Sequence, residues 1–543
     1  MHLSAHDLQQ IDKDYIDSLP MSSLVQLCQK LSTDLKEAHD RLNQNPQNSS
    51  KPPSSEPPWS KSTSDEGEGE LNEKLTEEDF LLEKDSSTQD NDDNNEEEEE
   101  EDKQTESENE PEKPETTSAV QDDENEDSTK KPGKQLGAEG CGLKFGNNLE
   151  VSEVITHRPE SCHACALPFA EDAESVSYTA RFEIELVPPL SGAGLELKKT
   201  KHIYDERECS CGHKSRSKPG RCPKEEGWSV ELTEWHMAGP LLVSFIVSLS
   251  KRQRTSRQRI HEFLLEWFDL HLCVGTINQC IHEAGRALTP VVENEIMNEI
   301  ILSALLYADE TSWKEKKAAL WLWVFSCATA TLFIVGRRNK KIAQKILGQF
   351  GGWLMSDGYH IYRDYEWRLR CWAHLLRKAR GLAESLEQEA QNFGKQTLQL
   401  LETLMEAIYQ ARENPTADDI YKQNEKKLLE FCGLCEEYWD CEHEKTRALA
   451  REFWYDWDAI WCVLKDPSLP LTNNEAERAL RHWVISRRIS FGTRTPEGTA
   501  AFTSIASVID TCYKRKVSPW KYIADVIRLR RKGLPVPPLP AVA

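Results

Sequence analysis

The stretch LLYADET at residues 305–311 decides the fold that we expect for this chain, because it joins an apolar, strand-like run to two acids. The run predicts a strand from Ile301 to Tyr307. Further strands are predicted at Ala318 to Cys327, Thr331 to Val335 and Trp353 to Ser356, with a helix at 339–349 before the last of them. Strands that a crossover helix connects predict a mixed α/β sheet.

Two further segments place an acid beside an apolar run. The strand Trp353 to Ser356 ends at Asp357, which a glycine follows. Farther along, Thr472 or Asn473 can cap a helix, which places Glu477 within the first turns of that helix. One acid at the end of a strand is usually a turn residue, but three acids in apolar settings form a candidate site.

Phosphoryl transfer uses acids in this kind of arrangement. Two Mg²⁺ ions about 3.5–4 Å apart can activate the attacking oxygen and stabilise the leaving oxygen. Mg²⁺ is a hard cation, and a few carboxylates together with substrate oxygens suffice to hold it. The candidate catalytic and metal-binding residues are Asp309, Asp357 and Glu477, and the expected ions are Mg²⁺ or Mn²⁺. Glu310 and Glu475 lie nearby in the sequence and are the competing acids.

The three acidic segments resemble the DDE motifs of insertion-sequence-66 transposases. They read Asp-Glu-Thr after the first strand, Asp-Gly-Tyr after a later strand, and Asn-Asn-x-Ala-Glu-Arg-Ala-Leu-Arg in the last segment. Other stretches that resemble this family are residues 42–55 (LNQNPQNSSKPPSS), 131–137 (KPGKQLG) and 371–374 (CWAH), the last followed by Arg377 and Lys378. The similarity covers most of residues 18–530 apart from an acidic insert.

This resemblance implies an RNase-H-like catalytic core with a mixed sheet, which a helical insertion interrupts between Asp357 and Glu477. It also implies that Asp309 and Asp357 flank two metal ions and that Glu477 completes the second metal site. Glu477 is preferred over the neighbouring acid because it matches the acid–Arg pair of the family.

Basic residues predict two regions that contact DNA. Arg478 and Arg481 follow Glu477 and suit backbone phosphates, while His374 suits DNA or the rim of the site. A surface Glu–Arg pair for Arg481 and a buried role for His374 remain open alternatives. Residues 251–287 combine a basic start with two helices, which fits a helix-turn-helix or an ordinary helical hairpin. The phosphate-binding residues expected there are Lys251, Arg252, Arg254 and Arg257.

Cysteines in one part of the chain have the spacing of metal ligands. Cys162 and Cys165 form a Cys-x-x-Cys pair, and Cys209 and Cys211 follow as Cys-x-Cys. Four thiolates around a structural Zn²⁺ ion would stabilise a small module with little core of its own, as in related transposases. His213 or Cys222 could replace a ligand of the second pair, and reduced thiols without a metal remain the alternative.

A second cysteine group lies in the expected helical insertion, at Cys432, Cys435, Cys441 and His443. Its spacing also suits metal ligands, but cysteines on the buried faces of helices are the favoured interpretation. The N-terminus lacks the pattern of a signal peptide, and no apolar run approaches the ~20 residues that span a bilayer. We therefore expect a cytoplasmic protein, associated with the nucleoid when bound to DNA, whose cysteines are reduced or metal-bound.

The charge of the 543-residue chain is concentrated in one segment. Residues 1–140 carry 13 Lys and Arg against 39 Asp and Glu, a net charge of −26, whereas residues 141–543 carry 54 against 53. Residues 61–129 alone hold 30 acidic and 5 basic side chains. Self-repulsion and a lack of apolar residues predict that this acidic segment is disordered, either as a spacer or as a mimic of nucleic acid.

The chain is therefore expected to be a multidomain α/β protein. The predicted parts are a helix that packs on its own protein or forms a coiled coil (1–45), a disordered linker with the acidic insert (46–140), a zinc-binding module (141–230), a helical, helix-turn-helix-like DNA-binding region (231–295), the first part of the catalytic core (296–383), a helical insertion (384–460), the last part of the core with Glu477 (461–512), and a C-terminal helix with a proline-rich tail (513–543).

The function that these features imply is DNA transposition by a DDE transposase. The expected partners are double-stranded DNA, as terminal inverted repeats and as target, and further copies of this chain in a synaptic complex. A structure-specific nuclease with the same three acids, and a DNA-binding derivative without catalytic activity, are the alternatives.

Overall fold

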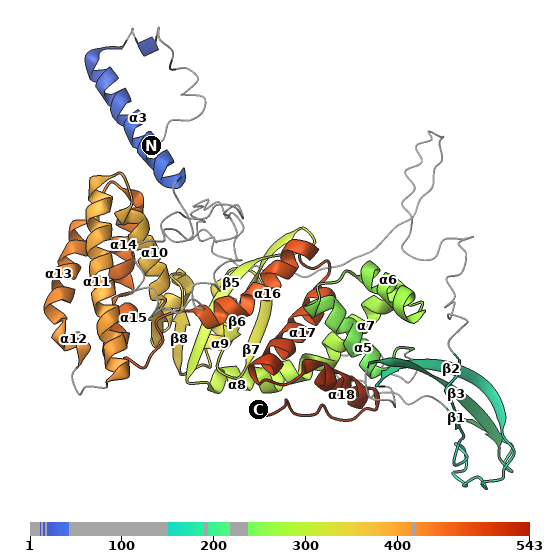
Figure 1. Cartoon of the computed structure of the whole chain (residues 1–543). Helices are drawn as coiled ribbons and strands as arrows, with labels where there is room; N and C mark the ends of the chain where they lie inside the picture. Colours follow the sequence, from blue (N-terminus) through green and yellow to red (C-terminus); the bar gives the residue numbers. More distant parts are fainter. Residues whose placement is uncertain are drawn as a thin grey trace, which may run out of the picture. The chain divides into compact units, whose positions relative to one another are not determined.

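The computed structural model describes residues 11, 15–16, 19–42, 150–188, 194–217, 237–414 and 419–542 (Figure 1). The predictions for the linker, the acidic insert and Cys222 lie outside the described residues. The helix predicted near the N-terminus is α3 (Met21–Leu42), and its coiled-coil interpretation stays a prediction. The described part is a mixed α/β structure with two sheets, as the sequence predicts.

The first sheet belongs to the cysteine-bearing part of the chain. Its strands are β1 (Glu153–His157), β2 (Val176–Val187), β3 (Glu196–Glu208) and β4 (Lys214–Arg216), with β3 between β1 and β2 and with β4 paired to β3. The β1–β3 pair is parallel and the other pairs are antiparallel. Glu185 of β2 accepts hydrogen bonds from the N–H groups of Leu241 and Leu242, so its carboxylate satisfies the N-terminus of the helix that follows.

Helices form most of residues 240–302. They are α5 (Pro240–Val247), α6 (Arg257–Phe268), α7 (Val274–Pro290) and α8 (Met297–Leu302), with π-helical turns at Ser248–Arg252 (η2) and Val291–Ile296 (η3). From Cys280 onward α7 is almost wholly buried, and Glu283 pairs with Arg531 of α18 (Pro519–Arg531). The exposed residues of α7 are Val274, Gly275 and Gln279, all in its first two turns, and the helix-turn-helix interpretation of α6 and α7 stays a prediction.

The second sheet contains five strands in the order β7-β6-β5-β8-β9. They are β5 (Leu305–Glu315), β6 (Ala318–Ser326), β7 (Thr331–Gly336), β8 (Trp353–Ser356) and β9 (Arg368–Arg370), and α9 (Lys340–Leu347) connects β7 to β8. The pairs β7–β6 and β6–β5 are antiparallel, whereas β5–β8 and β8–β9 are parallel. The mixed sheet with a crossover helix is therefore confirmed.

The position predicted for the first strand of this sheet is wrong. Residues 297–302 form α8, and β5 runs from Leu305 to Glu315, so Asp309 lies inside the strand and not at its end. The antiparallel pairing with β6 continues as far as Glu315 opposite Ala318, which keeps the polar residues after Asp309 extended. A short apolar run does not by itself distinguish the end of a helix from the start of a strand.

The helical insertion packs around its own apolar core. Helix α10 (Trp372–Ala383) precedes it. The helices of the insertion are α11 (Gln388–Glu413), α12 (Ile420–Gln423), α13 (Glu425–Glu437), α14 (Glu444–Tyr455) and α15 (Trp457–Trp461), and 3₁₀ turns lie at His360–Asp364 (η4) before α10 and at Cys462–Leu464 (η5) after α15. The core includes Trp372, Phe393, Phe453 and Trp461. Residues 384–455 are thus mostly helical, as predicted.

A buried ion-pair network connects the insertion to β9. Arg370 of β9 is fully buried and pairs with Glu452 of α14 and with Asp456, whose Oδ2 lies 3.0 Å from Arg370 Nε. Arg368 also pairs with Asp456, at 2.6 Å. Gly358, directly after Asp357, lies against this network, since a Cβ there would be 2.8 Å from Glu452 Oε1. A side chain at position 358 would therefore displace the ends of Arg370 and Glu452 from their contact.

Three helices complete the described chain: α16 (Asn474–Ser490), α17 (Pro496–Lys514) and α18. The last part of the core was expected at residues 461–512. Within it, Phe491 and Gly492 have positive φ angles of 57° and 86° and end α16. A new helix then begins with Pro496, a residue suited to a first helical turn. The side chains of Thr511 and Ser507 on α17 accept hydrogen bonds from the N–H groups of Thr331 and Phe333, so α17 covers the edge strand β7.

Candidate functional site

The pairing of β5 with β8 places Asp309 beside Asp357. Tyr307 pairs with Met355 in parallel register, and continuing that register by two residues brings the two acids level on neighbouring strands. Such strands lie about 4.8 Å apart. Both acids are half-buried. Two of the three predicted acids therefore lie side by side, with Asp309 within β5 and Asp357 directly after β8.

Asn473 positions the helix that carries Glu477. Its side chain was expected to cap α16, but it makes no capping hydrogen bond and instead donates to the carbonyl of Ala308 at 2.9 Å. Asn473 is fully buried, and its backbone N–H contacts Cys371 Sγ at 3.3 Å. The first turn of α16 is thus attached to the residue that precedes Asp309.

The electrostatics of the acids show that they share one region. Burial raises the pKa of Asp309 well above its usual value, and the negative charges of Asp357, Glu310 and Glu477 raise it further. Burial would also raise the pKa of Glu477, but a hydrogen bond from His374 and the positive charges of His374 and Arg377 lower it overall. Without a cation, Asp309 therefore resists ionisation while Glu477 favours it.

Glu477 belongs to a compact group with Cys371 and His374. His374 Nε2 lies 3.1 Å from Glu477 Oε1, and one donor atom from each of the three residues lies within 4.8 Å of the others. Among the described residues, only this group and a cluster of four cysteines are spaced so closely, so Asp309, Asp357 and Glu477 do not form such a compact group. Burial raises the pKa of Cys371 to about 12, and the sequence-based prediction missed this residue.

Glu310 contacts residues of the Asp357 loop. Its buried carboxylate accepts hydrogen bonds from Tyr362 at 2.8 Å and from Arg338 at 3.1 Å. The Arg338 guanidinium lies 4.0 Å from the ring centroids of both Trp321 and Tyr359. Burial, together with the charge of Asp357, raises the pKa of Glu310 to about 7. Glu310 therefore ties β5 to the Asp357 loop, a role that its proximity to Asp309 in the sequence did not reveal.

The other competing acid, Glu475, is engaged in surface ion pairs. Its carboxylate lies 3.0 Å from Arg478 and 2.9 Å from Lys514. The pKa of Glu475 falls because these two cations outweigh its partial burial, which alone would raise it. Arg478 is thus paired with the neighbouring acid in this structure.

The predicted basic residues before α6 lie against α16 and α17. Arg254 NH2 lies 2.8 Å from His482 Nδ1, and His482 Nε2 lies 2.9 Å from the carbonyl of Lys251. The ammonium of Lys251 lies 5.4 Å from the Phe502 ring, and burial lowers its pKa to about 8. Arg252 stacks on Tyr513, with 4.7 Å to the ring centroid. The structure thus brings this basic turn to the helix that carries Glu477 and Arg481, whereas Arg257 stays exposed on α6.

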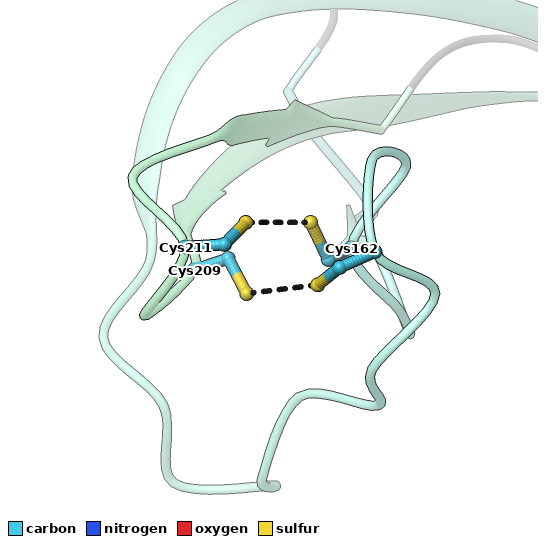
Figure 2. A group of neighbouring side chains, drawn as sticks. Cys162, Cys209 and Cys211 are labelled. Atoms are coloured by element: carbon cyan, nitrogen blue, oxygen red, sulfur yellow. Dashed lines mark hydrogen bonds between the residues drawn. The ribbon is translucent and has the colours of Figure 1, made fainter.

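The four cysteines that the sequence favoured as zinc ligands lie together (Figure 2). The sulfurs of Cys162 and Cys211 are 3.6 Å apart, as are those of Cys165 and Cys209, and all four lie within 4.8 Å of one another. None of the four forms a disulfide. A regular tetrahedron of sulfurs about 2.3 Å from a central Zn²⁺ has edges of about 3.8 Å, so the donor set fits this ion.

Two tight turns position these sulfurs. Cys162 accepts a backbone hydrogen bond from Cys165, which lowers the pKa of its thiol to about 6, and the N–H of Cys211 likewise lowers the pKa of Cys209. The N–H of Leu167 lowers the pKa of Cys165, but the neighbouring thiols and burial raise it overall to about 12. Without a metal, the pKa values of Cys162 and Cys209 are thus lowered, and those of Cys165 and Cys211 are raised. His213 is exposed beside the second turn.

The second cysteine group, Cys432, Cys435, Cys441 and His443, lies within the described residues but does not form a compact cluster. Cys435 is buried in the core of the insertion, and the Cys441 thiol contacts Glu389 at 3.4 Å. His443 instead caps α14, because its Nδ1 accepts from the N–H of Thr446. The structure therefore supports the interpretation of these cysteines as part of helix packing.

The fold and the acids define a mixed α/β protein with candidate metal-binding carboxylates on a strand, a loop and a helix. Residues 236–501 match the model of the Transposase IS66 family. This match, which covers just under half of the chain, identifies residues 236–501 as a domain of the Transposase IS66 family, and transposases are DNA-processing enzymes.

Three proteins of Sinorhizobium fredii are similar to this chain, and all three carry the name uncharacterized protein. One, y4hP, is 23% identical over 304 residues, which are 48% of this chain and 53% of y4hP. Another, y4qI, is 24% identical over 274 residues, 44% of this chain and 50% of y4qI. The third, y4jO, is 36% identical over 85 residues, 16% of this chain and 26% of y4jO. The chain thus spans about half the length of these relatives or less. Within the described ranges, no helix has the length and apolar character that crossing a bilayer requires.

Proposed function

We propose that this transposase binds the terminal inverted repeats of its element and uses Asp309, Asp357 and Glu477 to cut DNA strands and join them to a target. The observation that carries this proposal is the parallel register of β5 and β8, which, continued two residues past Tyr307 and Met355, sets Asp309 level with Asp357. The bond from Asn473 to Ala308, which attaches the Glu477 helix to the same strand, supports it independently.

The strand order supports an RNase-H-like core. Three antiparallel strands, β7, β6 and β5, are followed by two strands parallel to β5. Asp309 lies within β5, and Asp357 directly follows β8. The helical insertion α11 to α15 lies in the chain between Asp357 and Glu477, as the resemblance implies. The residue boundaries of the predicted parts remain part of this proposal.

The acids fit a pair of Mg²⁺ or Mn²⁺ ions. Carboxylate oxygens are the ligands that such hard cations prefer. Burial and then the neighbouring acids raise the pKa of Asp309, and a cation would neutralise that negative charge. Bound there, the ions would supply an activated attacking oxygen and stabilise the leaving oxygen. Asp309 and Asp357 would hold ions from the sheet, and Glu477 would do so from α16. His374, whose Nε2 lies 3.1 Å from Glu477 Oε1, would hold this carboxylate in place and contact a DNA phosphate at the rim of the site.

The remaining parts of the proposal concern binding. Zn²⁺ on Cys162, Cys165, Cys209 and Cys211 would stabilise the first sheet, since the sulfur–sulfur distances in the structure fit a tetrahedral ion. The basic turn around Arg252, the exposed Arg257 and the arginines of α16 would contact DNA phosphates. A synaptic complex would bring together several copies of the chain, bound to the nucleoid in the cytoplasm.

A strand-transfer assay tests the proposal. The wild-type protein, with Mg²⁺ and a labelled fragment that carries an end of the encoding element, should cut the fragment and join its 3′ end to target DNA. Asp357→Asn should reduce both products by at least 10³-fold and leave DNA binding largely unchanged. Asp364→Asn, at an exposed acid paired with Lys340, is the matched control and should keep activity.

Other outcomes separate the alternatives. Cleavage without joining would identify a structure-specific nuclease. DNA binding without cleavage by the wild type would identify a regulatory derivative. Full activity of Asp357→Asn would contradict the assignment of the acids.

A further inference from the structure

Phe491 presents a large apolar side chain to solvent where α16 ends. Its side chain is 71% exposed, and that of nearby Ile489 is 59% exposed. The φ angle of Phe491 is 57°, in the left-handed region, which is unusual for a bulky residue. Backbone strain of this kind persists only where the surrounding structure imposes it, and it concentrates at functional positions.

The segment after Phe491 is fastened to the turn between β5 and β6 (Figure 1). The N–H of Thr493 donates to the carbonyl of Lys314 at 2.9 Å, and the N–H of Lys316 donates to the carbonyl of Thr493 at 2.9 Å. Gly492 packs so closely that a Cβ would lie 2.1 Å from the Lys314 oxygen. Because the backbone on both sides is held, the exposed position of the Phe491 ring is a fixed feature.

The surroundings of this ring are basic. Residues 312–318 and 488–498 together contain two acids, and the hydroxyl of Thr499 donates to one of them, Glu315. The exposed basic residues of these two segments are Lys314, Lys316, Lys317, Arg488 and Arg494. An exposed apolar ring within a cluster of positive charge fits a nucleic acid, which offers stacking bases between phosphates.

The geometry of α16 relates this ring to the candidate metal site. Glu477, Arg481 and Arg488 are spaced i, i+4 and i+11, so they lie along one face of the helix. Phe491 follows fourteen residues after Glu477, which corresponds to ~21 Å along a helix with a rise of 1.5 Å per residue. That length matches about six base pairs of duplex DNA at ~3.4 Å each.

We infer that Phe491 is a base-stacking residue that contacts bound DNA about six base pairs from the phosphate that is cut. This inference rests on the proposed cleavage function. Arg481 and Arg488 hold the phosphates between the two points, and the ring packs against the bases and partly unstacks one step. Stacking accepts any base, so Phe491 sets the position and local shape of the DNA and does not read its sequence.

Fluorescence of 2-aminopurine provides the test. The base analogue is placed singly at successive positions on both sides of the cleavage point, and the complex is formed with Ca²⁺ in place of Mg²⁺ to prevent cutting. The wild type should raise the fluorescence at one or two adjacent positions about six base pairs from that point. Phe491→Ala should remove this signal and weaken binding about 10-fold, whereas Phe491→Trp should keep both.

Two controls exclude indirect effects. Phe491→Gly should remove the signal while its melting temperature equals or exceeds that of the wild type, because glycine tolerates the positive φ angle. Tyr455→Ala, at a 57% exposed aromatic of the helical insertion, should leave the signal unchanged. A signal that survives in Phe491→Ala, or the lack of any position-specific signal in the wild type, would overturn the inference. Failure of the proposed function would be seen separately, as a lack of Mg²⁺-dependent cleavage by the wild type.

Discussion

At the scale of single residues, three side chains make contacts that their positions in the sequence did not predict. Asn473 attaches α16 to the carbonyl of Ala308, although an asparagine at that position looks like an ordinary helix cap. Glu310 bonds Tyr362 and Arg338 and so stabilises the loop that carries Asp357. Cys371 lies against Asn473 and Glu477. These contacts join residues far apart along the chain, and no local pattern encodes them.

The raised pKa of Asp309 predicts how the metal-free protein responds to pH. The folded state binds the proton more tightly than the unfolded state, so stability is lost as the pH rises from the ordinary carboxyl range through the raised pKa. Asp309→Asn removes this charge and should raise the melting temperature at pH 8 by about 2–4 °C. At pH 4 the difference should be small.

Thermal unfolding with and without Mg²⁺ measures this effect. Adding Mg²⁺ should stabilise the wild type and narrow the gap to Asp309→Asn, because the cation neutralises the same carboxylate. If Asp309→Asn were less stable than the wild type at pH 8 without metal, the negative charges of the neighbouring acids would not be destabilising the Asp309 carboxylate.

At the scale of secondary-structure elements, the sequence predicted the bounds of β8 correctly but not the start of β5 or the end of α16. The bounds of β8 agree with the prediction, because apolar Trp353 to Ser356 stands between glycines and Asp357. The start of β5 was misplaced because its apolar run continues from α8. The break at Phe491 was missed because only the following glycine hints at it, while the tertiary bonds of Thr493 enforce it.

The two turns that carry Cys162, Cys165, Cys209 and Cys211 predict that a bound metal stabilises the first sheet. Treatment with a strong chelator should remove one Zn²⁺ per chain and lower the melting temperature of the first sheet, since metal binding contributes directly to the folding of small modules. Cys165→Ser should have the same effect, whereas Cys432→Ser, in the insertion, should keep both the zinc and the melting temperature. Elemental analysis and calorimetry measure these outcomes. Equal zinc content in both variants would contradict the assignment.

At the scale of the whole molecule, the chain order of the parts could be predicted more fully than their contacts. The apolar periodicity indicated a mixed sheet, and the strand order agrees with that expectation, while the helical insertion was implied by the family resemblance. The network of Arg370 with Glu452 and Asp456 could not be predicted, because its members are more than eighty residues apart and each resembles a surface charge in the sequence. This network fixes the insertion beside the Asp357 loop.

The most direct test of the proposed metal site is anomalous diffraction from crystals of the protein–DNA complex grown with Mn²⁺. Anomalous peaks about 2.1–2.3 Å from carboxylate oxygens of Asp309 and Asp357, with Glu477 on one of the ions, are the predicted result. Manganese bound elsewhere, with the three carboxylates directed away from any shared ion and from the DNA backbone, would contradict it.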